Sequence, residues 1–499
     1  MDYVIGCDVG TQGTKSLLLS LTGQVICEAY EGYPIDFPRP LWAEQPVTRW
    51  LNGLTLTVRR LLSESGVAAK NIRALSLATQ VDGLIPIDSG RQPLHPAMIW
   101  MDRRAGAQCE RVRQHLTDEQ IFQLTGLNLD ASHVAPKIRW LADQHPEIYE
   151  RAVHFLVPGS YLAYALTGEM GIDYSNASST LLLDIHTKTW SGVMADAFNI
   201  DQNKLPPIGA ATATLGGLRP VVAEELGLRD GTPVMLGCGD EHSACVGSGV
   251  IGPGIVGDIS GTAEPVCVAS QELAFDNTRL VETHCHADPD LWLLENPGFL
   301  SGGNYRWFRE QFAKTETYAS LDAEADRVEP GAEGLTFLPN LMGALTPTWN
   351  EAARGTYAGF TLAHTRGHFV RALLEGSAYA LRDIVTQMQL AGVQLSELRV
   401  MGGGAKSQLW NQIKADVTGL PVHVPEVTET TALGAAFLAL VGTGACTTLR
   451  EASDMIVRIR RRVEPDPSRA ALYAEAYERY RQTYFTLLPV FENAAKRTI

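Results

Sequence analysis

The first residues that could carry chemistry follow a short apolar run at the amino terminus. Asp8, Gly10, Thr11 and Thr14 lie close together in the sequence, and Lys15 comes directly after them. A strand that ends in a glycine-rich polar turn can bring backbone N–H groups and hydroxyls against a phosphate. The turn lacks the glycine before lysine that a Walker A loop requires. By itself, the segment fits a phosphate loop and an ordinary hairpin turn equally well.

A similar segment occurs half a chain later. Residues 255–259 form an apolar run, and Gly261 and Thr262 follow it. Two related domains that each offer a phosphate loop to one shared cleft explain this repeat economically. We therefore expect two phosphate-binding loops: Gly10, Thr11 and Thr14 in the first, and Gly261 and Thr262 in the second.

A third glycine-rich segment lies at residues 402–406, between a predicted strand at 398–401 and a predicted helix from Ser407 onward. Glycines at such a position let a flat base and its ribose approach the backbone closely. A Gly-Gly-Gly run taken alone is more often an ordinary loop. We assign ATP binding in this segment to four residues: Gly403, Gly404, Ala405 and Gln408.

Two carboxylates complete the set. Asp240 lies in a glycine-flanked turn after a predicted strand at 234–236, and Asp8 ends the first strand. Phosphoryl transfer needs phosphate clamps, a metal that spreads charge and a group that positions the attacking oxygen. We therefore assign Asp240 as catalytic residue and Asp8 with Asp240 as Mg²⁺ ligands. The structural alternatives are that Asp240 caps a helix near His242 and that Asp8 pairs with Lys15.

The elements that must position these groups alternate between strands and helices. We predict a hairpin over 16–30, a strand at 72–78 that ends in the polar residues 79–83, a long helix over 371–390 and a final amphipathic helix over 468–494. Glycine and proline concentrate near 245–255. This pattern predicts an α/β protein with two domains, residues 1–250 and residues 251–499.

Composition narrows the class of protein. The 499-residue chain is 45% hydrophobic and carries a net charge of −15, which argues against nucleic acid or an anionic membrane as the main partner. No apolar run has the ~20 residues of a membrane span, and the amino terminus does not resemble a signal peptide. The eight cysteines form no C-x-x-C pair. Reduced thiols of this kind are typical of a cytoplasmic protein.

At this point the sequence resembles a known family, the FGGY carbohydrate kinases of the actin-like ATPase superfamily. The resemblance covers roughly residues 3–445. It rests on the two phosphate loops, the glycine segment continuing to Pro421, the Asp240 turn with Gly247 and Gly249, and the segments 100–104, 173–177 and 371–376. It implies two ribonuclease-H-like domains that close over a cleft, the first mainly for a sugar and the second mainly for ATP. It also implies Asp240 as catalytic base, and it suggests a homodimer.

The resemblance also points to the acceptor. Within the family the spacing is most similar to the xylulokinases, in which residues 80–83 would be Gln-Met-His-Gly; here they are Gln80-Val-Asp82-Gly. The family places this segment against the sugar. The residues that the resemblance assigns to the sugar are Gln80, Asp82, Trp100, Asp102 and Arg103.

The resulting expectation is a kinase that uses ATP and Mg²⁺ to phosphorylate a terminal hydroxyl of a small sugar, first of all a ketopentose such as D-xylulose. Because Asp82 departs from the xylulokinase pattern, another pentulose or polyol (ribulose, erythritol or a glycerol-like compound) stays open. A non-catalytic, sugar-responsive binding protein and an actin-like ATPase switch are the alternatives from other classes. Asp240, both loops and the glycine segment favour a working kinase over either.

Overall fold

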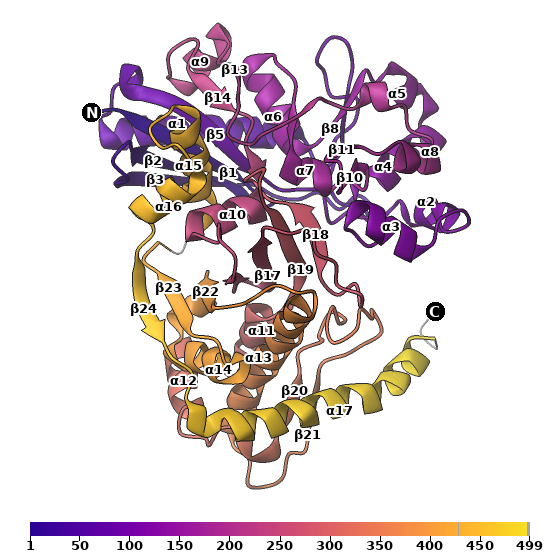
Figure 1. The fold of residues 1–499 in the computed structure, drawn as a ribbon, viewed down its shortest axis with the longest axis vertical. Helices are drawn as coiled ribbons and strands as arrows, with labels where there is room; N and C mark the ends of the chain where they lie inside the picture. The colour runs from indigo at the N-terminus through magenta and orange to yellow at the C-terminus, as the bar shows by residue number, and fades with distance from the viewer. Residues whose placement is uncertain (428, 497–499) are drawn as a thin grey trace.

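A computed structural model describes residues 1–427 and 429–496 and shows two mixed β-sheets with helices packed on them (Figure 1). The strands of the first sheet, in spatial order, are β3 (Val25–Gly32), β2 (Gly13–Ser20), β1 (Tyr3–Val9), β5 (Ile72–Thr79), β14 (Pro233–Met235) and β13 (Thr214–Gly217), with β15 (Cys238–Gly239) also paired to β5. Strands β1, β2 and β3 are antiparallel, whereas β5, β14 and β15 run parallel to β1.

The second sheet repeats this arrangement. Its spatial order is β18 (Glu282–Cys285), β19 (Trp292–Leu300), β17 (Ala263–Ser270), β16 (Ile255–Ile259), β22 (Glu397–Met401), β23 (Val422–Pro425) and β24 (Ile459–Val463). Strands β16, β17 and β19 are antiparallel, and β22 and β23 run parallel to β16. The two sheets thus share one topology, which confirms the predicted α/β fold with two related domains.

The remaining elements surround the two sheets. The helices are α1 (Val47–Ser65), α2 (Gly106–Val112), α3 (Asp118–Thr125), α4 (Val134–Gln144), α5 (Pro146–Arg151), α6 (Pro158–Thr167), α7 (Tyr174–Ser178), α8 (Gly192–Phe198), α9 (Pro220–Leu226), α10 (Asp240–Ser248), α11 (Gly302–Phe312), α12 (Tyr318–Ala325), α13 (Arg366–Leu390), α14 (Gln408–Thr418), α15 (Thr430–Gly442), α16 (Leu449–Ile456) and α17 (Ala470–Ala495). Short strands are β4 (Glu44–Gln45), β6 (Ile85–Ile87), β7 (Ala97–Met98), β8 (His154–Leu156), β9 (Ile172–Asp173), β10 (Leu183–Asp184), β11 (Thr189–Trp190), β12 (Ile208–Gly209), β20 (Thr336–Leu338) and β21 (Thr356–Ala358). No helix within the described residues combines the length and the apolar character of a membrane span.

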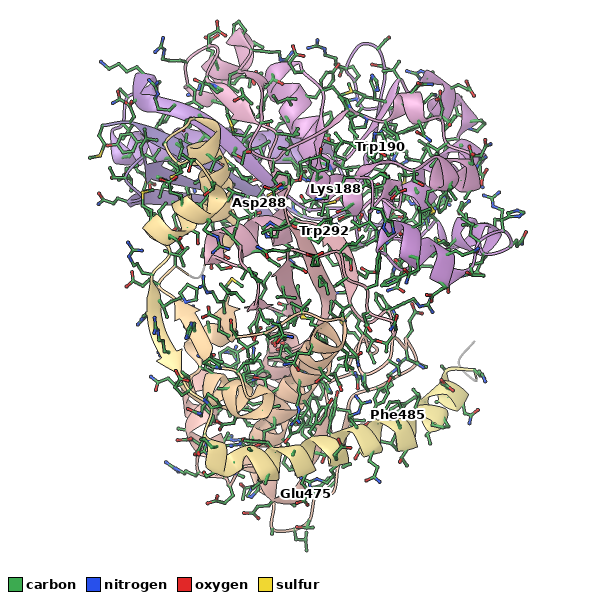
Figure 2. All side chains as sticks on the ribbon, in the orientation of Figure 1. Lys188, Trp190, Asp288, Trp292, Glu475 and Phe485 are labelled. Carbon is green, nitrogen blue, oxygen red and sulfur yellow. The ribbon has the colours of Figure 1, made fainter. Side chains whose placement is uncertain are left out.

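The final helix, α17, shows how its sequence pattern sets its packing. Four tyrosines at helical spacing are buried against the second domain: Tyr473, Tyr477, Tyr480 and Tyr484. Phe485 follows this stripe but is 44% exposed, because it points off the buried face (Figure 2). The predicted helix is confirmed, and its buried side consists mainly of tyrosine.

Helices α10 and α15 cross in very close contact between the two sheets. A Cβ atom at Gly434 would lie 1.9 Å from the backbone oxygen of Ser243, and one at Gly247 would lie 2.0 Å from that of Thr430. Only glycine fits at these crossing points. All strands of the first sheet precede residue 250, yet α15 packs on β1 and β5 of that sheet (Figure 1). The first domain is therefore completed by a helix from late in the chain.

The second sheet is also joined to the first domain through its edge. The backbone N–H of Thr283 in β18 donates to Gly126 O (2.9 Å), and Asn128 Nδ2 donates to Glu282 Oε1 (3.0 Å). Lys188 Nζ donates to Pro289 O (2.5 Å) and lies 4.2 Å from the centre of the Trp292 ring, in the middle of the molecule (Figure 2). These contacts connect β18 and β19 to the helical part of the first domain.

Candidate active site

The ends of three parallel strands place the main candidate residues together. In the first sheet Val9 of β1 pairs with Thr79 of β5, and Gly239 of β15 pairs with the same Thr79 from the other side. The segments that leave these strands therefore begin at one edge of the sheet. They are the loop at residues 10–12, the segment 80–83 and the start of helix α10.

Asp8 and Asp240 lie at this edge, and both are partly exposed. Burial and the charge of Asp240 raise the pKa of Asp8 to about 8, although Lys15 acts in the opposite direction. Burial, followed by the charge of Glu241, raises the pKa of Asp240 to about 7. Asp240 is the first residue of α10, Gly239 occupies the cap position, and Asp240 Oδ1 accepts a hydrogen bond from the N–H of Glu241 (3.0 Å). The carboxylate of Asp240 thus lies at the start of this helix without being its cap residue.

The structural alternative for Asp8 was an ion pair with Lys15. Lys15 lies opposite Asp8 across β1 and β2, but its Nζ pairs with Glu429 Oε2 at 2.5 Å, just before α15. Lys15 therefore supports the site as a nearby charge without neutralising Asp8 directly.

Hydrogen bonds from neighbouring residues hold the first phosphate loop in place. The Gly10 N–H donates to Gly13 O (3.0 Å), and the Tyr33 hydroxyl donates to Gly10 O (2.8 Å). Thr14 is fully buried and its hydroxyl lies 3.3 Å from that of Tyr33. The structure thus leaves Gly10 and Thr11 accessible, while Thr14 belongs to the support of the loop.

Thr11 connects the phosphate loop to the predicted sugar residues. The Trp100 indole N–H donates to the Thr11 hydroxyl (2.9 Å), and Thr11 Oγ1 lies 3.4 Å from Gln80 Oε1. Gln80 itself is buried and donates from Nε2 to Gln45 Oε1 (3.0 Å). Trp100 is 45% exposed, so its ring offers an accessible aromatic face beside the loop. Three of the predicted residues, Thr11, Gln80 and Trp100, are therefore in contact.

Asp82 is held in an unusual backbone conformation. Its φ is +57°, in the left-handed region, which costs an ordinary residue free energy unless the surroundings hold it there. Buried Lys137 supplies this support, because its Nζ donates to Asp82 O (2.6 Å), Ile99 O (2.8 Å) and Ser132 O. One cation thus fixes three segments of the site, and burial lowers its pKa to about 8.

Asp102 and Arg103 do not join the contact between Thr11, Gln80 and Trp100. Asp102 is fully buried, and its carboxylate accepts hydrogen bonds from Ala43 N (2.8 Å) and from the Arg104 guanidinium (2.6 Å). Arg103 pairs with Asp130 instead. Arg104 lies over the Trp42 ring at 3.6 Å. Asp102 therefore anchors the turn that carries Trp100, and the predicted sugar contact by Asp102 is not supported by its position.

The second phosphate loop rests on a buried cation. Lys414 Nζ lies 2.6 Å from Asp258 Oδ2, 3.0 Å from Glu264 Oε1 and 3.1 Å from Ser260 Oγ. Both carboxylates and the lysine are fully buried. Asp258 occupies the position in β16 that Asp8 occupies in β1, yet only Asp258 is paired with a cation. The repeat thus keeps the loop in both domains, whereas the free carboxylate is found only in the first.

The predicted nucleotide loop packs on the second phosphate loop. Ile259 of β16 pairs with Met401 of β22, so both loops leave the same sheet edge. The Gly404 N–H donates to Ser260 O (3.0 Å), and a Cβ at Gly404 would lie 2.1 Å from Ser260 Oγ. Gly261, Thr262, Gly403 and Gln408 are partly or fully exposed around this contact, whereas Ala405 is buried. The structure brings the predicted ATP residues of the second domain together.

Two further acidic groups are Glu241, next to Asp240 in α10, and Glu295, in β19 of the second sheet. Glu241 donates a hydrogen bond to Glu295 of β19, and burial together with this neighbour raises the pKa of Glu241 well above its usual range. Burial, above all, raises the pKa of Glu295 to about 7. The pKa values of both carboxyl groups are thus raised where α10 meets β19. Among the described residues, no group of three or more His, Cys, Asp or Glu side chains is arranged to hold a metal, including the segment around His284.

A surface hollow of about 490 Å³ lies elsewhere, on α17, lined by Glu478, Arg481, Gln482, Phe485 and Thr486. None of these residues belongs to a strand end or a glycine loop. The site is therefore defined by the converging strand ends and not by this hollow.

Sequence reasoning missed several residues that build the site. Gln45, Lys137, His133 and Glu241 were not singled out, and neither was Gly302, whose N–H donates to Gly261 O (3.1 Å). The Ser-Gly-Gly run at 301–303, directly before a helix, was a signal for the last of these. The others contact the site through segments distant in sequence, for which no local pattern exists.

Comparison with known proteins agrees with this geometry. The model of the FGGY family of carbohydrate kinases matches in two parts, the N-terminal domain over residues 3–247 and the C-terminal domain over residues 259–443. The chain is 30% identical to the xylulose kinase of Bacillus subtilis over 484 residues, 97% of both chains. It is also 30% identical to the autoinducer-2 kinase of Salmonella paratyphi A over 502 residues, 97% of this chain and 94% of that one.

A solved structure gives the same result. The crystal structure of xylulose kinase from Rhodospirillum rubrum superposes with a TM-score of 0.91 at 27% identity and covers 98% of this chain and 100% of that chain. The match extends over both domains and includes both phosphate loops. The chain therefore belongs to the FGGY family of carbohydrate kinases, phosphotransferases that use ATP and an alcohol group as acceptor.

Proposed function

We propose that this kinase phosphorylates a terminal hydroxyl of a small ketose, first of all a ketopentose such as D-xylulose. The observation that carries this proposal is the position of Asp240, a carboxylate with a raised pKa at the same sheet edge as the first phosphate loop and Trp100. The similarity to xylulose kinases supports the choice of acceptor.

In this proposal Asp240 accepts the proton of the acceptor hydroxyl while that oxygen attacks the γ-phosphorus of ATP. The bond from the γ-phosphorus to the bridging oxygen breaks, and ADP leaves with the bonding electrons. A base works best when its pKa lies near the working pH, and a pKa of about 7 meets this condition. General base catalysis of this kind contributes typically ~10²–10⁴-fold to the rate.

Asp8 and Asp240 fit a magnesium ion. Mg²⁺ is commonly held by one or two carboxylates, with waters and substrate phosphates as its other ligands. The charge of Asp240 contributes to the raised pKa of Asp8, and the lysine opposite Asp8, Lys15, pairs with Glu429. When bound, the ion would neutralise charge on the phosphates of ATP.

The phosphates would lie between the two loops, with Gly10 and Thr11 on one side and Gly261 and Thr262 on the other. The adenosine would lie along Gly403, Gly404 and Ala405, with Gln408 beside it. The contact between Gly404 and Ser260 supports this arrangement, because it joins the nucleotide loop to a phosphate loop. Closure of the domains over both substrates would exclude water and so prevent hydrolysis of ATP.

Gln80, Asp82 and Trp100 are the proposed sugar contacts, with Arg103 at the margin. Asp82 favours a second candidate acceptor, another pentulose or a polyol, because it offers a carboxylate oxygen where the xylulokinase pattern has an imidazole. The similarity to an autoinducer-2 kinase agrees with a wider range of acceptors in relatives of this identity.

A coupled ADP-release assay tests the proposal. The purified protein would be given MgATP with D-xylulose, D-ribulose, L-ribulose, erythritol, glycerol and D-gluconate, and without acceptor. We expect release of ADP with a ketopentose or polyol and little without acceptor. ADP release that is equally fast without any acceptor would favour an ATPase switch, and sugar binding without ADP release would favour a binding protein. Both results would contradict the proposal. A homodimer and a cytoplasmic location stay predictions, and light scattering measures the first.

A further inference from the structure

His133 lies beside Asp82 although the two residues are far apart in sequence. His133 precedes helix α4, and its Nδ1 lies 3.1 Å from Asp82 Oδ2 and 2.8 Å from Ser179 O. Both side chains of the pair are almost completely buried. Burial acts against the charged imidazole, but the carboxylate of Asp82 outweighs it and raises the pKa of His133 to about 9. His133 is therefore mostly protonated at neutral pH.

Only one of the two carboxylate oxygens of Asp82 is used by this pair. Asp82 Oδ1 is buried and has no hydrogen-bond partner among the described residues. A buried carboxylate oxygen without a partner is costly, and native structures seldom leave one unless a ligand or water completes it. Burial, above all, raises the pKa of Asp240 and Glu241, and the charge of Asp82 contributes to both shifts, so Asp82 lies close enough to act on the proposed base electrostatically.

The rest of the Asp82 side chain and backbone is fixed. Lys137 holds the carbonyl of Asp82, and the backbone adopts a left-handed conformation. His133 is itself tied by Ser179 to the end of helix α7, and Ser175 of this helix accepts at Oγ the N–H of Gly239 (3.0 Å), next to Asp240. Asp82 and Asp240 are thus positioned by one connected set of contacts.

We propose that His133 is a substrate-positioning residue: it holds the Asp82 carboxylate so that Oδ1 accepts a hydrogen bond from a hydroxyl of the acceptor, other than the hydroxyl that is phosphorylated. This inference rests on the proposed function and adds the residue that selects the acceptor. The acceptor thus meets a carboxylate oxygen at position 82, and the imidazole of His133 holds this carboxylate in place.

This arrangement selects a class of acceptor. A neutral ketose or polyol with a hydroxyl at the selected position donates to Oδ1, whereas its deoxy analogue cannot. An aldonate would bring a second carboxylate toward Asp82 and Glu241. The nearby cations are already engaged: His133 pairs with Asp82, Arg103 pairs with Asp130, and Lys137 donates to three backbone carbonyls. We therefore expect neutral acceptors to be preferred over aldonates.

The test compares His133→Leu, His133→Asn and Asp82→Asn with the wild type, using the best neutral acceptor of the panel. Asparagine can place its Nδ2 donor near the position of the histidine Nδ1, whereas leucine has no donor. We expect the KM for the acceptor to rise about ten- to hundredfold in His133→Leu and Asp82→Asn, the range for hydrogen bonds to charged groups. In His133→Asn the rise should be within about threefold, and the KM for ATP should stay unchanged in all three.

The double variant Asp82→Asn/His133→Leu supplies a second readout. If His133 acts through Asp82, the double variant binds the acceptor no more weakly than Asp82→Asn alone. Calorimetric titration of the acceptor without ATP gives the same comparison independently of turnover. If His133→Leu does not fold, His133→Asn and Asp82→Asn still carry the test through their difference in acceptor affinity.

Four results would each overturn the role of His133. The first two are an acceptor KM that is unchanged in His133→Leu, and equal effects of the leucine and asparagine variants. The other two are additive effects in the double variant, and a rise in the KM for ATP as large as the rise in the KM for the acceptor. Preference for D-gluconate over neutral acceptors would overturn the selected class. In all these cases the wild type still phosphorylates a sugar and the proposed function stands. A wild type that phosphorylates no acceptor overturns both.

Discussion

Asp8 and Asp240 leave two strands that flank β5 in the same sheet, and burial together with the charge of Asp240 raises the pKa of Asp8 to about 8. Two carboxylates that are far apart in the sequence of the first domain thus act on each other electrostatically, while the lysine opposite Asp8, Lys15, pairs with Glu429. Their mutual repulsion is the electrostatic feature that a divalent cation would relieve. This relationship sets the first two predictions.

Replacing Asp8 with asparagine should weaken the response of the protein to magnesium. In the wild type Mg²⁺ should raise the Tm, and more so at pH 8 than at pH 6, because protons compete with the metal for both carboxylates. Asp8→Asn should lose most of this shift and need at least tenfold more Mg²⁺ for half-maximal activity. Thermal unfolding with a magnesium titration measures both effects. Asp196→Asn, at an exposed position in α8, is the control. Equal magnesium responses in the two variants would exclude Asp8 as a ligand.

The rate should depend on pH through Asp240. Because its pKa is raised to about 7, the carboxyl is mostly protonated at pH 6 and mostly ionised at pH 8. Only the ionised form accepts a proton, so kcat/KM should rise with pH and level off above about pH 8. Below about pH 6 it should fall nearly tenfold for each pH unit. Initial rates at low acceptor concentration give this profile. A kcat/KM that stays constant from pH 5.5 to 8 would show that no such base limits the reaction.

A site residue could be predicted from the sequence only where its neighbours in sequence form a recognisable pattern. Asp8, Asp240 and the two loops stand out because a strand, glycines and a carboxylate follow one another within a few residues. Lys137 gives no such signal, since a lysine in an amphipathic helix normally faces solvent, and only the fold shows it buried against three carbonyls. The same is true of His133, which lacks a recognisable motif around it.

Two other features of the structure have no local signal in the sequence. Asp102 follows an apolar run, as a ligand-binding residue would, but Arg104 turns inward and pairs with the Asp102 carboxylate. In sequence, helix α15 lies between β23 and β24 of the second sheet, yet its small residues let it pack on β1 of the first sheet. Periodicity predicts that a segment is helical and buried, but not which sheet it contacts.

The buried lysine below the second phosphate loop should be essential for stability. Lys414→Met would leave the carboxylates of Asp258 and Glu264 buried without their cation, which typically costs about 3–5 kcal/mol. Lys406→Met removes an exposed lysine just before the same helix and should change stability by less than about 0.5 kcal/mol. Urea unfolding compares the two variants. Identical midpoints would mean that the Lys414 network contributes nothing to the folded state.

The crossing of α10 and α15 should control both stability and rate. Gly434→Ala places a Cβ 1.9 Å from Ser243 O, so the helices must move apart, and α10 carries Asp240 at its start. Overpacking of this kind costs typically about 1–3 kcal/mol, and kcat should fall as Asp240 is displaced. Gly106→Ala in α2, where a Cβ meets nothing within 4 Å, is the matched control. A Gly434→Ala variant with the Tm and kcat of the wild type would contradict the close crossing.

The most direct test of the whole account is the kcat of Asp240→Asn with the best acceptor, measured beside wild type and Asp196→Asn. Asparagine keeps the size of the side chain but cannot take up the proton. We predict a fall of ~10²–10⁴-fold in kcat, with ATP binding retained in a titration and Asp196→Asn at the wild-type rate. A kcat for Asp240→Asn equal to that of the wild type would contradict the assignment of Asp240 as the base.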